Sequence, residues 1–270
     1  MRSETPIVHV AFGTDKFSQA LARLRRSARR FGVRDVRLYG VDHPAVLQAA
    51  GQNPKIMKQS RGAGYWLWKP YILLDTLRTV EEGTVVVYTD AAQRYIADPS
   101  PLIDLTASRD VILFHNDKDY LQRHWTKRDC FVLMRADEPL YWDARQLDAS
   151  IQIYRAGPKA QSFLLEMQDT MRDPRILCDE ANMSGPNLDG FVDHRHDQSI
   201  LTILAIKYKI ETFPCPKVVV NRRLSESDDR AARKAQVLRA KGPLIFEHHR
   251  RKNERPRIYW RRLFDDFLGR

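Results

Sequence analysis

Short apolar runs alternate with helically spaced apolar residues at the start of the chain. Ile7–Phe12 is almost continuously apolar, which predicts a buried strand. Residues 17–31 carry Phe and Leu at helical spacing with arginines largely on the other faces, so they predict an amphipathic helix that ends at Gly32. Asp35–Tyr39 then predicts a second strand. This order of elements is typical of a parallel crossover.

A helix and a fully buried strand follow. The helix is predicted to begin near Pro70 and to carry an apolar stripe as far as Val80. The segment Thr84–Tyr88 is apolar on both faces, as expected of a central strand covered on both sides. It leads directly into Asp90. A carboxylate at the carboxyl end of such a strand lies where open α/β sheets bind ligands.

The second half of the chain contains the same two kinds of pattern. Ser150–Arg155 alternates apolar and polar residues as a half-exposed strand does. Further strands are predicted over Val111–Phe114, Cys130–Met134 and Val218–Val220, and helices over Lys159–Met171 and Asp197–Tyr208. These elements predict a single α/β domain with a mostly parallel central sheet flanked by helices.

The predicted boundaries divide the chain into a domain and a tail. We expect the domain over residues 1–221, with a first half at 1–96 and a second half at 97–221. Residues 222–270 are expected to form a basic tail that packs on the domain. No internal repeat is found.

The composition fits a globular protein of 270 residues, with 43% hydrophobic and 29% charged residues. Its three cysteines are widely spaced, which indicates neither a disulfide framework nor a Cys-x-x-Cys zinc site. The apolar runs fall far short of the roughly 20 residues needed to span a bilayer. We therefore expect a cytoplasmic protein.

The positive charge is concentrated near the carboxyl end. The net charge is +11, and residues 222–270 contain 15 Lys and Arg against 7 Asp and Glu. Such a segment can attract nucleic-acid phosphates, anionic lipid or a phosphorylated ligand, and it can also be a solvated surface without a dedicated partner. Charge alone does not choose among these.

Three segments supply candidate chemistry around Asp90. Phe12, Gly13 and Thr14 follow the first strand at the same predicted edge, where Gly13 would let the backbone approach a base or phosphate. Asp197 and Gln198 stand at the start of a helix, where Asp197 can also act simply as the helix N-cap. Asp90 itself can cap a turn. The combination of these residues favours a ligand site over separate capping roles.

Cations and histidines complete the candidate set. Arg61 and Lys69 flank an aromatic run, and a cation there is costly to bury unless an anion such as a nucleotide diphosphate accompanies it. His248 and His249 in the tail are candidate metal ligands, or surface residues beside arginines. The chain has no Gly-x-x-x-x-Gly-Lys-Ser/Thr phosphate loop.

The motifs GYWLWKP, VVVYTDAA, SIQIYRAGPKAQSFL and HDQSILTILA, in this order, resemble the nucleotide-sugar-dependent glycosyltransferases of the GT-A fold, of the bacterial polysaccharide and lipopolysaccharide type. The resemblance implies that Asp90 matches the first aspartate of a metal- and ribose-binding motif. Ala92 stands where many members have a second carboxylate, so His248 or His249 would have to supplement the Mn²⁺ or Mg²⁺ site.

The resemblance also implies roles for the other candidates. Phe12, Gly13, Thr14 and Ala91 would line the nucleotide pocket, with Arg61 and Lys69 nearby. Asp197 and Gln198 are similar to the Asp-Gln pair of retaining galactosyl- and glucosyltransferases, which favours retention. Inversion stays open, because Asp197 can also act as a base toward an acceptor hydroxyl.

We therefore expect a hexosyltransferase that uses a nucleotide diphosphate sugar, preferably a UDP-sugar, and a glycan or lipid-linked acceptor in surface polysaccharide synthesis. Its basic residues are expected to bring it to the inner membrane surface as a peripheral protein, and no nucleic acid is expected as a partner. A sugar-phosphate nucleotidyltransferase and a non-enzymatic nucleic-acid-binding protein are the alternatives.

Overall fold

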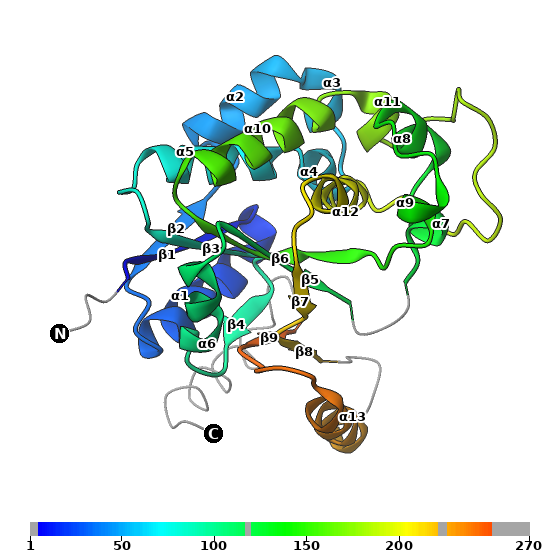
Figure 1. The fold of residues 1–270 in the computed structure, drawn as a ribbon. Coiled ribbons are helices and arrows are strands. Elements are labelled where there is room, and N and C mark those ends of the chain that lie inside the picture. Colours follow the sequence, from blue (N-terminus) through cyan, green and yellow to red (C-terminus); the bar gives the residue numbers. More distant parts are fainter. Residues whose placement is uncertain (1–4, 117–119, 221–225, 250–270) are drawn as a thin grey trace.

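A six-stranded sheet with strand order β2-β1-β3-β6-β5-β7 forms the centre of the protein (Figure 1). A computed structural model describes residues 5–116, 120–220 and 226–249. The strands of the sheet are β1 (Ile7–Phe12), β2 (Asp35–Tyr39), β3 (Val85–Thr89), β5 (Val111–His115), β6 (Leu147–Arg155) and β7 (Thr212–Pro214). Only β6 runs antiparallel to its neighbours β3 and β5, while the other pairs are parallel. The predicted mostly parallel sheet is confirmed.

Helices cover both faces of this sheet. In Figure 1, α2, α5 and α10 lie on one side and α1 and α6 on the other. Successive side chains of β3 pack on alternate faces of the sheet. Val86 and Tyr88 belong to one apolar cluster, and Val85 and Val87 belong to the other. The double coverage explains why this segment is apolar throughout its length.

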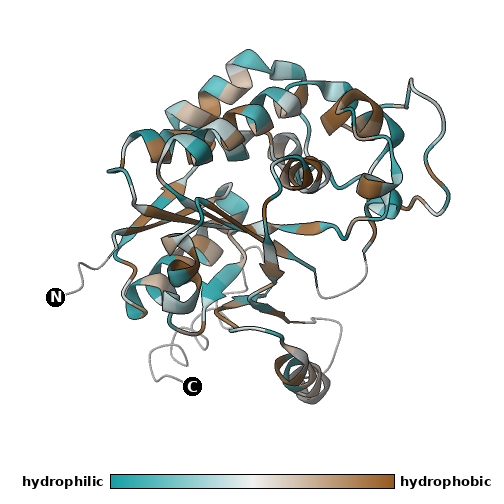
Figure 2. Ribbon diagram, viewed as in Figure 1, coloured by the Kyte–Doolittle hydropathy of each residue, from teal (hydrophilic) through white to brown (hydrophobic). Residues whose placement is uncertain are grey.

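The helices vary greatly in length. They are α1 (Ser18–Arg30), α2 (Pro44–Gln52), α3 (Pro54–Met57), α4 (Gly62–Tyr65), α5 (Trp68–Arg78), α6 (Ser100–Ile103), α7 (Gln122–Trp125), α8 (Arg128–Leu133), α9 (Pro139–Trp142), α10 (Pro158–Met171), α11 (Pro174–Leu177), α12 (Asp197–Lys207) and α13 (Glu226–Arg239), with 3₁₀ turns at Asp15–Phe17 and Asp104–Ala107. Helix α12 is drawn largely in brown in Figure 2, and it is buried along most of its length. The buried helix therefore holds the residues of its first turn, which begins at Asp197, in a fixed position.

A second, three-stranded sheet joins distant parts of the chain. It has the order β4-β9-β8, with β4 at Gln93–Tyr95, β8 at Lys217–Val219 and β9 at Phe246–His248. Strand β9, from the segment predicted as a tail, pairs antiparallel with β4, which follows Asp90 by three residues. The described part of that segment is thus built into the fold beside the predicted ligand edge. The rest of it, residues 250–270, lies outside the described residues.

Two predicted strands differ in the structure. Cys130–Met134 forms most of helix α8 instead of a strand, because a short apolar run fits a buried helix as well as a buried strand. Ser150–Arg155 is a strand, but it is buried on both faces and begins earlier, at Leu147. Its polar positions Gln152 and Tyr154 hydrogen-bond to each other inside the protein, at 2.6 Å, so their polarity does not mark exposure.

Among the described residues, no helix combines the length and the apolar character that crossing a membrane requires.

Candidate functional site

A pocket of about 150 Å³ lies where β3 ends, and five of the predicted site residues line it. Asp90 follows β3, Lys69 comes from the first turn of α5, and Arg61 immediately precedes α4. The lining is completed by Trp66, Ala149, Ser150, Arg195, His196, Asp197 and Gln198. Segments that are far apart in the sequence therefore meet at one cleft, although Phe12, Gly13 and Thr14 are not among its lining residues.

Lys69 and Asp197 form a buried ion pair in the wall of this pocket. The Lys69 ammonium donates a hydrogen bond to Asp197 Oδ2 and a second one, of 3.0 Å, to the Ala149 carbonyl oxygen. Their side chains are 1% and 6% exposed. The anion that makes burial of Lys69 tolerable thus comes from the protein itself and not from the nucleotide diphosphate that the sequence suggests as one such anion.

Asp197 is the first residue of α12, and His196 is the N-cap. Because its carboxylate reaches Lys69, Asp197 does not play the capping role that the sequence left open. Burial raises the pKa of Asp197 to about 6, the positive charge of Lys69 opposes that rise, and the nearby Asp90 adds to it. Asp197 is therefore ionised at neutral pH and takes up a proton in mildly acidic solution.

Gln198 is fixed at both ends of its amide. Its Oε1 accepts a hydrogen bond of 3.3 Å from the Ala149 backbone N–H, and its Nε2 donates one of 2.7 Å to Gln146 Oε1. An amide oxygen has two lone pairs, so Oε1 keeps one for a ligand. The side chain is held in one orientation at the pocket wall, beside Asp197.

Asp90 is half-buried and is oriented by its neighbours. The Tyr88 hydroxyl donates to Asp90 Oδ1 at 2.7 Å, and the Asp90 backbone N–H donates to the Ser150 carbonyl oxygen at 3.0 Å. Among the described residues, Oδ2 has no hydrogen-bond partner. Asp90 therefore presents one carboxylate oxygen that a ligand can use.

A second buried ion pair lies behind Asp90. The Lys217 ammonium contacts Asp148 and donates a hydrogen bond of 2.7 Å to Ser150 Oγ. Burial tends to raise the pKa of Asp148, but Lys217 and Ser150 outweigh it and hold that pKa at about 2. Burial tends to lower the pKa of Lys217, and the carboxylates of Asp148 and Asp90 contribute to raising it instead. Asp90 thus lies near the buried ion pair of Lys217 and Asp148.

Arg61 fastens a long loop to the pocket. Its guanidinium donates to both oxygens of Asp193, at 3.2 and 2.6 Å, and to Asp179 at 3.2 Å. Both acids belong to the segment that joins α11 to α12. Arg61 was predicted to lie near a nucleotide, and in the structure it contacts two protein carboxylates. A phosphate would have to share it with them.

The backbone beside the pocket is left-handed over five consecutive residues. Positive φ angles run from Gly62 to Trp66, and Ala63, Tyr65 and Trp66 are not glycines. A non-glycine residue pays roughly 1–2 kcal/mol for this conformation. Such backbone strain clusters at functional sites. It places the Trp66 ring 5.8 Å from the ring of His196, at the start of α12.

The predicted nucleotide residues of the first strand do not line this pocket. The Phe12 ring is buried and stacks on Trp68 at 4.0 Å between centroids. A Cβ on Gly13 would lie 2.9 Å from Leu21 Cδ1, so close packing against α1 is itself a reason for this glycine. Thr14 precedes the 3₁₀ turn at Asp15–Phe17 without a capping hydrogen bond from its side chain, and Ala91 is buried.

The predicted metal ligands Asp90, His248 and His249 do not form a metal-binding cluster in the described residues. The described residues contain no group of three or more His, Cys, Asp or Glu side chains arranged to hold a metal ion. His249 is buried, with Nε2 at 3.4 Å from Arg23 Nη1, and a guanidinium there disfavours a cation. His248 pairs with Gln93 across β9 and β4. The donor set of the described residues does not fit a complete metal site, so the use of Mn²⁺ or Mg²⁺ stays a prediction.

Five residues that line the pocket are not among those predicted from the sequence, namely Trp66, Ala149, Ser150, Arg195 and His196. Burial lowers the pKa of His196, its Nδ1 lies 2.8 Å from the Leu177 carbonyl oxygen, and its ring lies 4.5 Å from that of Tyr65. His196 also has φ of 50°. The run His-Arg-His before Asp197 was the available signal, but nothing in it distinguishes a pocket residue from a loop residue.

Comparison with known proteins bears on the fold. No protein-family model and no curated protein sequence matches this chain. Among solved structures, the bifunctional glycosyltransferase WbbM in its apo form is similar to 94% of this chain, with 11% identity and a TM-score of 0.52. This chain spans 47% of the length of WbbM.

Two further solved structures are similar to this chain. Mouse xyloside xylosyltransferase 1 in its apo form aligns with 93% of this chain and 100% of its own, with 10% identity and a TM-score of 0.48. The galactosyltransferase LgtC, solved with donor and acceptor sugar analogues, aligns with 97% and 94%, with 12% identity and a TM-score of 0.49. At such identities a likeness concerns the fold, and the likeness to WbbM confirms the expected glycosyltransferase-type α/β fold.

Proposed function

We propose that this protein is a glycosyltransferase that moves a hexose from a nucleotide diphosphate sugar, preferably a UDP-sugar, to a glycan or lipid-linked acceptor in surface polysaccharide synthesis. One observation carries the proposal. Asp90, Asp197 and Gln198, from distant segments, line one pocket at the carboxyl end of β3. The fold around that pocket is similar to that of the glycosyltransferase WbbM.

Glycosyl transfer develops positive charge on the sugar and negative charge on the departing diphosphate, and the site has to stabilise both. The Asp197 carboxylate supplies negative charge on the sugar side. Because Lys69 holds Oδ2, Asp197 has its other oxygen to accept hydrogen bonds from donor hydroxyls. Lys69 thus acts as a positioning residue for Asp197.

Asp90 is assigned to the nucleotide side of the donor. Its Oδ2 can accept hydrogen bonds from ribose hydroxyls, since Tyr88 occupies Oδ1. The Arg195 side chain lines the same pocket and is the cation that we assign to the departing diphosphate, since the Lys217 ammonium is paired with Asp148. The basic residues from Arg250 onward lie outside the described part of the chain, and we propose that this segment closes over the diphosphate and contacts the membrane surface.

Retention of the anomeric configuration is the mechanism we favour. The Lys69 ammonium holds Asp197 Oδ2, and Asp197 stands next to Gln198 at the start of α12, as in the Asp-Gln pair of retaining enzymes that the sequence resembles. The fixed Gln198 amide beside it offers an oxygen that can lie beneath the anomeric carbon. Analysis of the product by NMR spectroscopy decides the point, because an inverted glycosidic linkage would contradict this assignment.

A thermal-shift screen of nucleotide sugars, with and without Mn²⁺, tests the proposal. A ligand that binds only the native state raises its apparent stability by about 2.7 kcal/mol at a hundred times its Kd. At least one UDP-hexose is expected to stabilise the protein, and mass spectrometry is expected to detect a glycoside and UDP. Pyrophosphate release would instead indicate a nucleotidyltransferase. Steeply salt-dependent binding to generic DNA or RNA, without any response to sugar nucleotides, would indicate a nucleic-acid-binding protein.

A further inference from the structure

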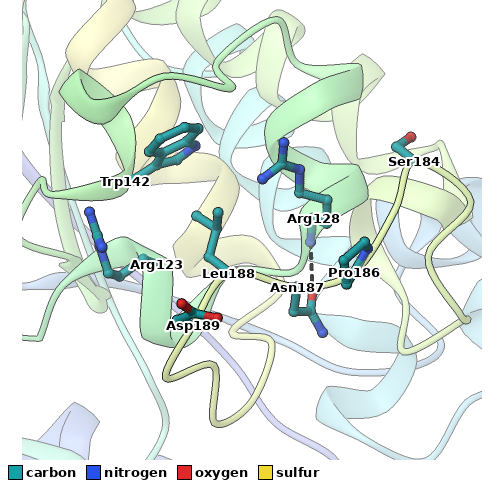
Figure 3. A pocket seen from close by; sticks show the side chains of 8 residues that line it. All are labelled: Arg123, Arg128, Trp142, Ser184, Pro186, Asn187, Leu188 and Asp189. Atoms are coloured by element: carbon teal, nitrogen blue, oxygen red, sulfur yellow. Dashed lines mark hydrogen bonds between the residues drawn. The ribbon is translucent and has the colours of Figure 1, made fainter.

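A second pocket, of about 360 Å³, lies beside α7, α8 and α9 and is walled on one side by the loop that follows α11. Figure 3 shows its lining residues, which are Arg123, Arg128, Trp142, Ser184, Pro186, Asn187, Leu188 and Asp189. Its volume is within the range of about 300–1,000 Å³ that is usual for small-molecule sites. None of these residues lines the pocket around Asp90.

Both arginines of this pocket are already paired with carboxylates. Arg123 forms an ion pair with Asp143, and Arg128 forms one with Asp137 at 2.6 Å. Asp189 adds a further carboxylate to the lining. An anion such as a phosphate would find no excess of positive charge here. The paired arginines and the additional carboxylate disfavour an anionic ligand, and the ring and hydrogen-bonding groups described next favour an uncharged one.

The apolar part of the pocket is an aromatic ring held in place. The Trp142 indole N–H donates to Asp137 Oδ1 at 3.1 Å, and the Arg128 guanidinium lies 5.8 Å from the centre of the ring. Leu188 lies between Trp142 and Arg128 in Figure 3. The ring is half-buried and its position is fixed on two sides. It offers a flat, rigid apolar surface at little cost in conformational entropy.

The polar part of the pocket is rich in planar hydrogen-bonding groups. The guanidinium groups and the Asn187 amide N–H groups donate, and the Asp189 carboxylate accepts. The Asn187 side chain is itself oriented, because its Oδ1 accepts hydrogen bonds of 2.8 Å from the Arg128 backbone N–H and 2.7 Å from Asn182 Nδ2. An uncharged molecule with many hydroxyl groups and one apolar side, as a pyranose sugar has, matches this arrangement.

The backbone connects this pocket to the one around Asp90. The segment that leaves Asp189 runs along α7, where the backbone N–H of Val192 donates to the His124 carbonyl oxygen at 2.8 Å and that of Arg195 donates to the Trp125 carbonyl oxygen at 3.0 Å. The Arg195 guanidinium lies 4.4 Å from the centre of the Trp125 ring, and Arg195 lines the pocket around Asp90. One short segment thus borders both pockets.

We propose that the pocket beside Trp142 binds an uncharged sugar residue of the acceptor glycan, at a distance from the bond that is formed. This inference rests on the proposed glycosyltransferase function and deepens it, because it makes the acceptor an oligosaccharide chain. A chain that engages both pockets gains affinity without any new contact to the donor.

Binding of neutral oligosaccharides to the full chain, in the absence of any donor, tests the inference. The probe is a printed array of gluco-, galacto- and manno-oligosaccharides, and the glycans that bind are then titrated by calorimetry. Trp142→Ala is expected to weaken their binding at least tenfold, and Asp189→Ala several-fold. Asp169→Ala, an equally exposed acid on α10, is the matched control and is expected to bind as the unaltered protein does.

The outcomes separate this inference from the proposed function. Asp90→Ala is expected to retain glycan binding, since Asp90 lines the other pocket. UDP-hexose hydrolysis by Trp142→Ala is expected to stay within twofold of that of the unaltered protein. If Trp142→Ala does not fold, Asp189→Ala carries the test, because the Asp189 side chain is exposed. The inference would be overturned if neutral glycans did not bind, or if Trp142→Ala and Asp189→Ala bound them as tightly as the unaltered protein does. Selective binding of peptides or polyanions in this pocket would also overturn it, even if UDP-hexose is turned over.

Discussion

The Lys69 ammonium and the Asp197 carboxylate, 128 residues apart in the sequence, form a hydrogen-bonded ion pair in the wall of the pocket around Asp90. Both side chains are almost completely buried. Neither residue reveals the other in the sequence, because Lys69 ends an aromatic run and Asp197 begins a helix. The pair links α5 to α12 and fixes the orientation of the only carboxylate that stands directly beside Gln198 in this pocket lining.

Lys69→Met is expected to destabilise the protein by about 3–5 kcal/mol at pH 7, because it leaves the Asp197 charge buried without a partner. Adding Asp197→Asn to this variant is expected to restore part of the loss, since no buried charge then remains. Chemical denaturation of the two single variants and the double variant measures the coupling. Additive losses would mean that the two side chains do not interact.

The titration of Asp197 is expected to affect activity and stability in opposite directions. Activity should fall as the pH drops through about 6, because Asp197 takes up a proton and loses its negative charge. The pKa of Asp197 in the folded protein, about 6, lies above its value of about 3.9 in the unfolded chain. The contribution of Asp197 protonation to stability is therefore fully present below about pH 3.9 and is lost as the pH rises through about 6.

Rate–pH profiles and denaturation between pH 4 and 8 measure these two effects. Asp197→Asn is the control for stability, because an amide does not titrate. This variant should lose the part of the pH dependence that Asp197 causes. A rate that stays constant between pH 5 and 7 would refute a role for the Asp197 carboxylate.

The left-handed turn before α5 offers a test of backbone strain. Gly64 has φ of 95°, and a Cβ there would lie 2.8 Å from Met57 Cα. Gly64→Ala is therefore expected to lose about 1–3 kcal/mol of stability and to reduce activity through Trp66. The matched control is Gly51→Ala in α2, where a Cβ meets nothing within 4 Å and a gain of up to about 1 kcal/mol is expected. Equal effects of the two substitutions would contradict this explanation.

The sequence predicted the main elements of the sheet and the place of Asp90 well. Apolar periodicity identifies a strand such as β3, and the rule that strand ends bind ligands locates the acid that follows it. Periodicity could not separate helix α8 from a strand, since both bury a short apolar run. It also could not find the small sheet, because β4 and β9 have three residues each and pair across some 150 residues of chain.

Part of the predicted set of site residues lies in one pocket, but the contacts of these residues were not predicted. Arg61, Lys69, Asp90, Asp197 and Gln198 do line one pocket, but the two cations have protein carboxylates as partners. Pairing between distant side chains depends on tertiary structure, which a local pattern does not encode. Gly13 illustrates the same limit, because the neighbour that excludes a side chain there is Leu21 and no ligand is needed to explain it.

Turnover of a UDP-hexose by the Asp90→Ala variant tests the central claim most directly. The Asp90 side chain is half-buried, and its loss should leave the fold intact. The control is Asp169→Ala, which removes an exposed acid that does not line the pocket. Release of UDP is expected to fall by about 10²–10³-fold relative to the unaltered protein, as it does when one preorganised electrostatic contact is removed from an active site. Unchanged UDP release by a folded Asp90→Ala protein would contradict the proposal that this pocket binds the donor.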